Sequence, residues 1–269
     1  MAYSRPKPLD ARPSASGLTA RMAGIGFQFA AEPEVDADIE QTLVHASEAG
    51  MDDGDLRVLG MLTTWLGIHH ARVNVDRLVR AVSDHPSLRV RAYWSAIAVW
   101  LASDRRFARL VTGDDAQSIE LLSEGNAFQI QRRGEDPRFA TSELRVPRGV
   151  LRDRVEDVLA PARRAAPHCG YRNRVQMGPT WRADVWTAFD SDPSISVAEC
   201  ARRVRCSFAV AWDVARDFAL LRVVGCSLDR RAPRQGAPAP TRTKRRRAAP
   251  RAGRRAAAPS AQAFANPLA

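Results

Sequence analysis

Apolar residues recur every three to four positions through most of residues 35–112, which is the spacing of one buried helix face. The pattern predicts a first helix capped by Asp36 or Asp38 and stopped by Gly50, longer helices at 55–70, 74–84 and 88–102, and a short turn around Phe107. The segment 88–102 is apolar on nearly all sides, so Trp94, Ile97 and Trp100 should be buried at its centre. Consecutive helices with short connections favour a helical bundle.

The periodicity is weaker on either side of this bundle. Residues 1–34 are rich in Pro, Ser, Gly and Ala, which predicts a disordered arm, although Ile25, Phe27 and Phe29 alternate as in a short docked strand. Residues 113–170 are expected to form a small connecting segment. Its predicted parts are a hairpin that pairs 127–131 with 139–146, a helix from Pro147 to Ala160, and a loop through Gly170.

A second periodic region, residues 171–228, predicts a trihelical unit with helices at 181–189, 197–204 and 208–220. Residues 229–269 hold too few apolar side chains to build a core and are expected to be a disordered tail. The sequence therefore predicts a mainly α protein. It would have an N-terminal helical bundle, a small α+β connecting segment, a C-terminal trihelical unit and disordered termini.

The positive charge of the chain is concentrated in this tail. Residues 229–269 contain eleven Arg or Lys and one Asp, so they account for +10 of the formal net charge of +11. The densest run is Lys244, Arg245, Arg246 and Arg247. A basic segment can bind the phosphates of a nucleic acid by releasing counterions, without any fixed structure of its own. The alternative is a solubilising extension that has no ligand.

The trihelical unit contains the sequence CARRVRCSFAVAWDVARDF. The stretch from Trp181 to Leu221 resembles the helix-turn-helix of bacterial DNA-binding regulators, a group that includes the winged-helix proteins. The resemblance implies that Ser207 caps the second helix and that Arg205 stands at a turn position where Gly is usual. The residues that it implies to face inward are Ala201, Val204, Ala211 and Val214.

This resemblance implies double-stranded DNA as the partner of the unit. Arg202, Arg203 and Arg205 would hold phosphates, and Arg216 is the one outward residue of the second helix suited to reading a base edge. The remaining outward positions are Phe208, Ala209, Trp212 and Asp213. The alternative is a structural unit in which Phe208 and Trp212 pack on a protein partner. Residues 221–224 have strand character, but no second strand of a wing is evident.

The two-part layout also resembles abortive-infection-type antitoxins, which join a winged helix to a second domain and act against a nucleotidyltransferase toxin. That resemblance implies a protein partner. Those antitoxins carry the winged helix at the amino end, whereas the helix-turn-helix-like unit of this chain lies at the carboxyl end.

The segment 171–184 leads into the trihelical unit and interleaves arginines with aromatic residues. Two interpretations are open. Arg172, Arg174 and Arg182 could form a phosphate-facing loop. Alternatively, Asp184 could pair with one of these arginines while Trp181 packs inside.

Candidate chemistry changes this picture little. The acids at 52–55 are placed to cap the following helix rather than to hold a metal. The adjacent His69 and His70 would lie on different helix faces, and the four cysteines lack the spacing of a zinc module. We therefore expect no catalytic residue, no metal and no cofactor. Without a secretory signal or a long apolar run, we expect a bacterial protein of the reducing cytoplasm that makes no membrane contact.

Overall fold

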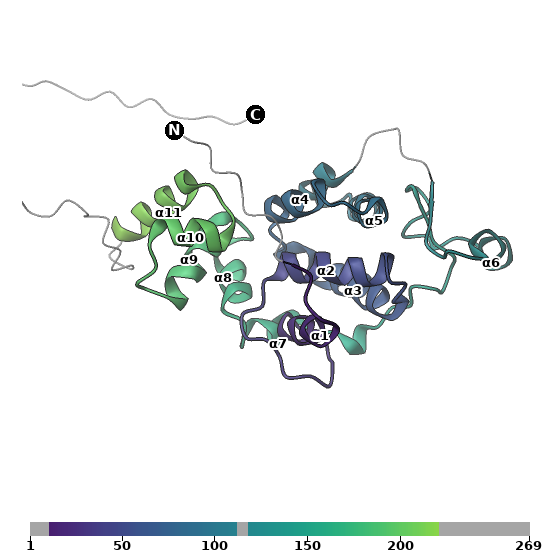
Figure 1. The fold of residues 1–269 in the computed structure, drawn as a ribbon, viewed down its shortest axis with the longest axis horizontal. Coiled ribbons are helices and arrows are strands. Elements are labelled where there is room, and N and C mark those ends of the chain that lie inside the picture. Colours follow the sequence, from purple (N-terminus) through teal and green to yellow (C-terminus); the bar gives the residue numbers. More distant parts are fainter. Residues whose placement is uncertain (1–10, 112–117, 221–269) are drawn as a thin grey trace, which may run out of the picture. The chain divides into compact units, whose positions relative to one another are not determined.

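The computed structural model describes residues 11–111 and 118–220, and within them the protein is mainly α-helical (Figure 1). The helices expected at 55–70, 74–84, 88–102, 181–189, 197–204 and 208–220 are all present. The expectations for residues 1–10, for a wing after Leu220 and for the basic tail fall outside the described residues. No helix in the described ranges is both long enough and apolar enough to cross a membrane.

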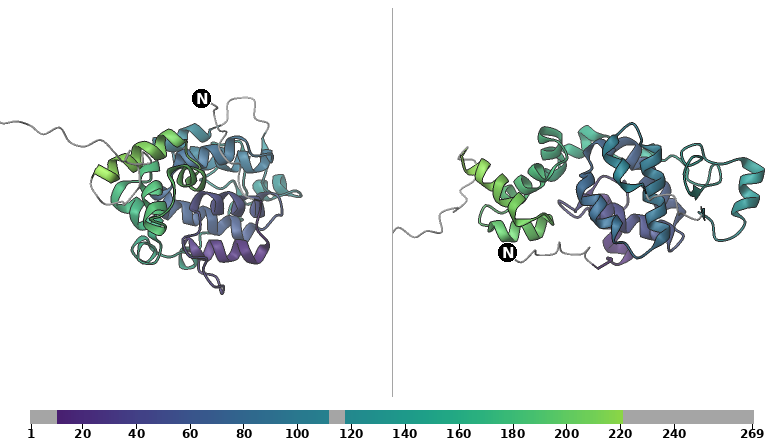
Figure 2. Two further views of the ribbon diagram at one scale, coloured as in Figure 1. Left: turned by 60° about the vertical axis from the view of Figure 1, so that its left-hand side comes forward. Right: turned by 90° about the horizontal axis from the view of Figure 1, so that it is seen from above.

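Four helices form the N-terminal bundle, and Figure 2 shows them packed together from two further directions: α2 (Ile39–Met51), α3 (Leu56–His69), α4 (Val75–Ser83) and α5 (Leu88–Trp100). Each begins at a side chain that accepts a backbone N–H, namely Asp38, Asp55, Asn74 and Ser87. Short 3₁₀ turns lie at His70–Arg72 and Arg105–Leu110. Trp94 and Ile97 are fully buried, as predicted, whereas Trp100 is only partly buried, over Gly67 of α3.

The prediction of a disordered arm is wrong for residues 11–34. Ser14 caps a helix, α1 (Ala15–Gly24), whose Leu18 and Met22 are buried against the bundle. The chain that follows docks as its alternation suggested. The Ile25 carbonyl accepts the indole N–H of Trp65 at 3.0 Å, and Phe27 forms an antiparallel bridge with Val158. Composition misses this order because the groups that stabilise the segment lie far along the chain.

The predicted hairpin is also wrong. Residues 127–131 lie within a helix, α6 (Asn126–Arg133), and β2 (Leu144–Arg145) pairs in parallel with β1 (Ile119–Glu120). The amide of Asn126 accepts the Leu122 N–H at 3.1 Å and donates to the Arg145 carbonyl at 3.2 Å. These two hydrogen bonds connect the start of α6 to β2. The local alternation of apolar residues gives no information about such a contact between separate segments.

The helix predicted from Pro147 to Ala160 is absent apart from a 3₁₀ turn at Val155–Asp157. Side chains bind the backbone groups that a helix would have used. Arg138 donates to the Leu151 carbonyl, and the Thr64 hydroxyl accepts the Arg154 N–H at 3.0 Å. The loop expected through Gly170 instead contains α7 (Pro161–Ala165) and the first part of α8 (Cys169–Met177).

The trihelical unit consists of α9 (Trp181–Ser191), α10 (Val197–Val204) and α11 (Phe208–Leu220), drawn in green in Figure 1. It has an apolar core of its own, whose members include Val185, Phe189, Cys200, Ala211 and Phe218. Helix α8 lies beside α9 and connects this unit to the bundle.

Candidate nucleic-acid interface

Helices α10 and α11 form a helix–turn–helix pair joined by a three-residue turn. The Cys206 N–H returns to the Ala201 carbonyl at 3.0 Å, which closes the end of α10. The Ser207 side chain then accepts the Val210 N–H at 3.3 Å and caps α11, as the sequence predicted. The inward face is also the predicted one, because Ala201, Val204, Ala211 and Val214 are all buried.

Arg205 occupies the turn position where glycine is usual, and its backbone is left-handed, with φ 66° and ψ 30°. An L-residue in this conformation brings its Cβ close to the following carbonyl oxygen. The carbonyl of Arg205 accepts a hydrogen bond from Arg80 Nη1 of the bundle at 3.1 Å. This contact connects the strained turn to α4 of the N-terminal bundle.

We expect Arg205→Gly to be more stable than Arg205→Ala by about 1 kcal/mol. Both variants lose the same guanidinium, so their difference is the strain of a Cβ at positive φ less the larger unfolded-state entropy of glycine. Urea unfolding of the two proteins, side by side, measures it. Equal stabilities would mean that the turn of the folded protein is not left-handed at Arg205.

The outward face of α11 carries two aromatic side chains. Phe208 and Trp212 are 54% and 38% exposed, and their rings stack with centroids 6.1 Å apart. Arg216 lies exposed one turn further along, with Nη2 3.6 Å from an Asp213 carboxylate oxygen. The face predicted to read bases is therefore open, and it carries two exposed aromatic rings beside one exposed ion pair.

The other predicted phosphate-binding arginines lie at the end of α10. Arg202 and Arg203 are exposed, and Arg202 forms an ion pair with Glu199 one turn earlier. Arg205 is partly buried in the turn. Lys244, Arg245, Arg246 and Arg247 lie outside the described residues.

The segment before α9 does not form the phosphate-facing loop that was one interpretation of its sequence. Arg174 lies on α8 and is 98% buried, where its Nε donates to Asp184 at 2.8 Å. Its terminal nitrogens donate to both carboxylate oxygens of Glu40 on α2, at 2.7 and 2.9 Å. The alternative interpretation, pairing of Asp184 with an arginine, is correct, and Trp181 is partly buried beneath Arg80.

A second arginine, Arg77 of α4, completes this buried charge cluster. It pairs with Asp38 and lies 3.3 Å from Glu40 and 3.6 Å from Asp184. Burial alone would raise the pKa of Asp38, but Arg77 and the Gln41 N–H lower it to about 2. For Arg174 the directions are reversed: burial would lower its pKa, but the neighbouring carboxylates of Asp184 and Glu40 raise it above its ordinary value. Asp38 and Arg174 are therefore ionised at neutral pH.

This cluster anchors the trihelical unit to the bundle. We define it by Asp38, Glu40, Arg77, Arg174 and Asp184, which come from α2 and its cap, α4, α8 and α9. Sequence reasoning found only the pairing of Asp184, because nothing in the local pattern of α2 or α4 marks Glu40 or Arg77.

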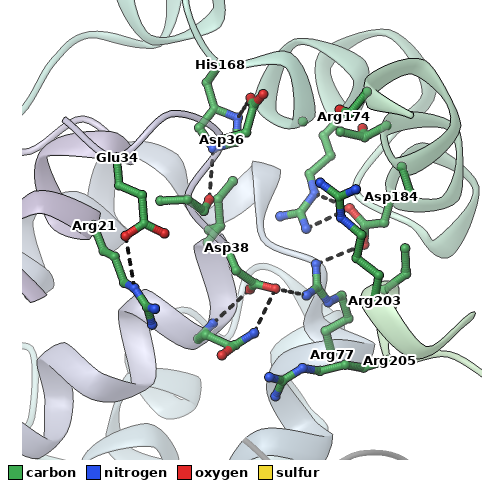
Figure 3. A pocket seen from close by; sticks show the side chains of 18 of the residues that line it. Arg21, Glu34, Asp36, Asp38, Arg77, His168, Arg174, Asp184, Arg203 and Arg205 are labelled. Atoms are coloured by element: carbon green, nitrogen blue, oxygen red, sulfur yellow. Dashed lines mark hydrogen bonds and ion pairs between the residues drawn. The ribbon is translucent and has the colours of Figure 1, made fainter. Parts of the chain in front are cut away.

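A cavity of about 690 Å³ lies beside the anchor cluster, and Figure 3 shows side chains that line it. Its walls come from Arg21 of α1, the loop before α2 and the first turn of α2, Arg77 of α4, helices α8 and α9, and α10 with the following turn. Arg202, Arg203 and Arg205, the arginines predicted to hold DNA phosphates, all line it.

The candidate metal ligands of the sequence serve structural roles. Asp55 caps α3, and His168 caps α8 while its Nε2 lies 3.1 Å from the Ala37 carbonyl. His69 is fully buried between Tyr171 and the Leu159 carbonyl. Among the described residues, no group of three or more His, Cys, Asp or Glu side chains is arranged to hold a metal ion.

Comparison with known proteins gives no match to this chain, whether with a family model, a curated protein or a solved structure. The resemblance to helix–turn–helix regulators stays a prediction from the sequence. The structure shows the local geometry of α10 and α11: Ala201 and Ala211 are buried, Ser207 caps α11, and the turn is left-handed at Arg205.

Proposed function

We propose that this protein binds double-stranded DNA through α10 and α11 and acts as a transcriptional regulator in the bacterial cytoplasm. The observation that carries the proposal is the helix–turn–helix pair, with its capped second helix and an outward face that no other described element covers. In such pairs the second helix enters the major groove while the first crosses the backbone.

The exposed side chains divide into two kinds of contact. Arg202 and Arg203 at the end of α10 suit phosphates, which position a protein on DNA without specifying a sequence. On α11, Arg216 can donate to guanine, and Phe208 and Trp212 can contact thymine methyl groups. The tail run Lys244–Arg247 adds affinity that is independent of sequence.

The test is a salt titration of DNA binding by the full chain and by a variant that lacks residues 230–269. Deletion should weaken binding strongly and flatten the salt dependence, by about 0.9 in slope for each phosphate of the duplex that the tail neutralises. Arg216→Ala in the full chain should reduce discrimination between cognate and random duplex by about 1–3 kcal/mol. Arg132→Ala, an exposed arginine of α6, is the matched control and should leave this discrimination unchanged.

One outcome would refute the role of α10 and α11. If the tail-deleted protein has no measurable affinity for duplex DNA at low salt, these helices do not bind DNA. Any binding by the full chain would then come from the tail alone.

A second candidate function, docking of a protein, is favoured by the stacked pair Phe208 and Trp212. Exposed aromatic side chains of this size are typical centres of protein interfaces. The partner would be a toxin, as for the antitoxins that the layout resembles. In that case Trp212→Ala should abolish the complex and leave affinity for DNA unchanged, whereas under the first proposal the same variant weakens DNA binding.

A further inference from the structure

The cavity beside the anchor cluster has the size of a small-molecule site, since such sites commonly measure a few hundred to a thousand Å³. The cavity is also lined by residues whose backbone has a strained, positive φ. Among the described residues, two non-glycine residues have positive φ, Asp36 (53°) and Arg205 (66°), and both line the cavity. Such conformations cost about 1–3 kcal/mol each and cluster at ligand sites.

Acidic and basic side chains both line the cavity, and several of them pair with each other: Glu34 with Arg21, Asp38 with Arg77, and Arg202 with Glu199. Glu34, Asp36 and Asp38 come from the loop before α2, whereas Arg203 and Arg205 come from α10 and its turn (Figure 3). Arg202, the residue before Arg203 on α10, also lines the cavity. Asp36 accepts the Cys169 N–H at 2.9 Å and Asp38 binds Arg77, so these carboxylates are fixed in place. A ligand that matched both sides would be anionic at one end and rich in hydrogen-bond donors at the other.

The side-chain oxygen of Gln41 is a further hydrogen-bond acceptor that a ligand with donor groups could satisfy. Gln41 lines the cavity and is 7% exposed, and its Nε2 donates to Asp38 at 3.2 Å. Its Oε1 accepts no hydrogen bond from the residues that the structure describes. A buried amide oxygen without a donor is uncommon in folded proteins, and a ligand hydroxyl or amine would satisfy it.

We propose that this cavity binds a small phosphorylated molecule of about mononucleotide size. The guanidinium groups of Arg202, Arg203 and Arg205 hold the phosphate, since arginine donates to phosphate oxygens in a bidentate manner. Glu34, Asp36 and Gln41 accept from hydroxyl or amine groups at the other end. The consequence for regulation rests on the proposed function: the same arginines are assigned to DNA phosphates, so the bound ligand weakens DNA binding.

The first experiment measures binding by calorimetry on the full chain without DNA. The probes are adenosine 5′-monophosphate and its two halves, inorganic phosphate and adenosine. The nucleotide should bind more tightly than either half. Arg203→Ala should weaken nucleotide binding by at least about ten-fold, the usual effect of removing a charged hydrogen-bond donor. Arg132→Ala removes the same charge from the exposed face of α6, outside the cavity, and should leave the affinity unchanged.

Two results would overturn the cavity as a site: no heat of binding at millimolar nucleotide, or equal losses in the two arginine variants. The second experiment adds duplex DNA, which the nucleotide should displace from the full chain. Arg216→Ala should weaken DNA binding and keep the nucleotide affinity. Nucleotide binding without any DNA binding would refute the proposed function and leave the cavity site standing. Nucleotide and DNA bound together without mutual weakening would overturn the regulatory consequence.

Discussion

Replacing Arg174 by Ala is expected to lower the free energy of unfolding by about 3–5 kcal/mol, because it leaves buried carboxylates without their partner. Glu40 and Asp184 are 2% and 7% exposed, and Arg174 donates to both. Arg77 alone, 3.3 and 3.6 Å from these two carboxylates, then has to balance three acids. Urea unfolding followed by circular dichroism measures the change.

The matched control is Arg182→Ala. Arg182 donates to Asp217 at 2.8 Å within the trihelical unit, but both side chains are more than 40% exposed. An exposed pair of this kind contributes only about 0–1 kcal/mol. The Arg182 guanidinium also lies over the Phe218 ring, 4.8 Å from its centroid, and such a contact adds about 0.5–1 kcal/mol at an exposed site. If the two variants lose similar stability, the anchor cluster is not buried in the folded protein.

The second large effect is a loss of stability as the pH falls from 6.5 to 4. Burial, with a smaller contribution from Arg164, lowers the pKa of His168 to about 4. Burial also lowers the pKa of His69 to about 4, against the hydrogen bond to the Leu159 carbonyl. Both histidines are therefore neutral in the folded chain and protonated in the unfolded chain over this range.

The sign follows from proton linkage. Since the unfolded state binds more protons between pH 4 and 6.5, acid favours unfolding, and the stability is fully present only above pH 6.5. Each histidine contributes up to about 1.4 kcal/mol per pH unit inside the window. Asp38, with its pKa lowered to about 2, loses its contribution only in more acidic solution.

Urea unfolding at a series of pH values tests this, together with the variant His168→Asn. Asparagine keeps an acceptor for the Tyr171 N–H and so preserves the helix cap while it removes the titration. The dependence on pH should fall to roughly half in this variant, since one of two shifted histidines remains. A stability that is flat between pH 6.5 and 4 would contradict the burial of both rings.

The sequence predicted those parts of the fold that local rules determine. Helices with a regular apolar face and a capping side chain, such as 55–70 with Asp55, were found at nearly their true bounds. Helix α1 was missed because its buried face is short, and the chain after it was missed because its partners, Trp65 and Val158, are distant. The helix expected after Pro147 does not form because side chains from other segments bind its backbone.

Only the local part of the candidate interface could be predicted from the sequence. The motif around Ser207 is local, so its cap, its turn and its inward face could be assigned residue by residue. The anchor cluster was not predictable, because Glu40 and Arg174 are 134 positions apart and a single sequence carries no signal of their pairing. The cavity was equally hidden, because the residues that line it lie far apart in the sequence.

The docked segment after α1 has a consequence for the order of events on the ribosome. Gln28 donates its N–H to the Asp157 carbonyl, and Gly26 accepts from the Leu159 N–H, both at 2.8 Å. These partners are made roughly 130 residues later, which takes on the order of 10 s at ordinary rates of synthesis. Until then residues 26–28 lack these backbone partners. This part of the core can therefore complete its pairing only after residues 157–159 have been synthesised.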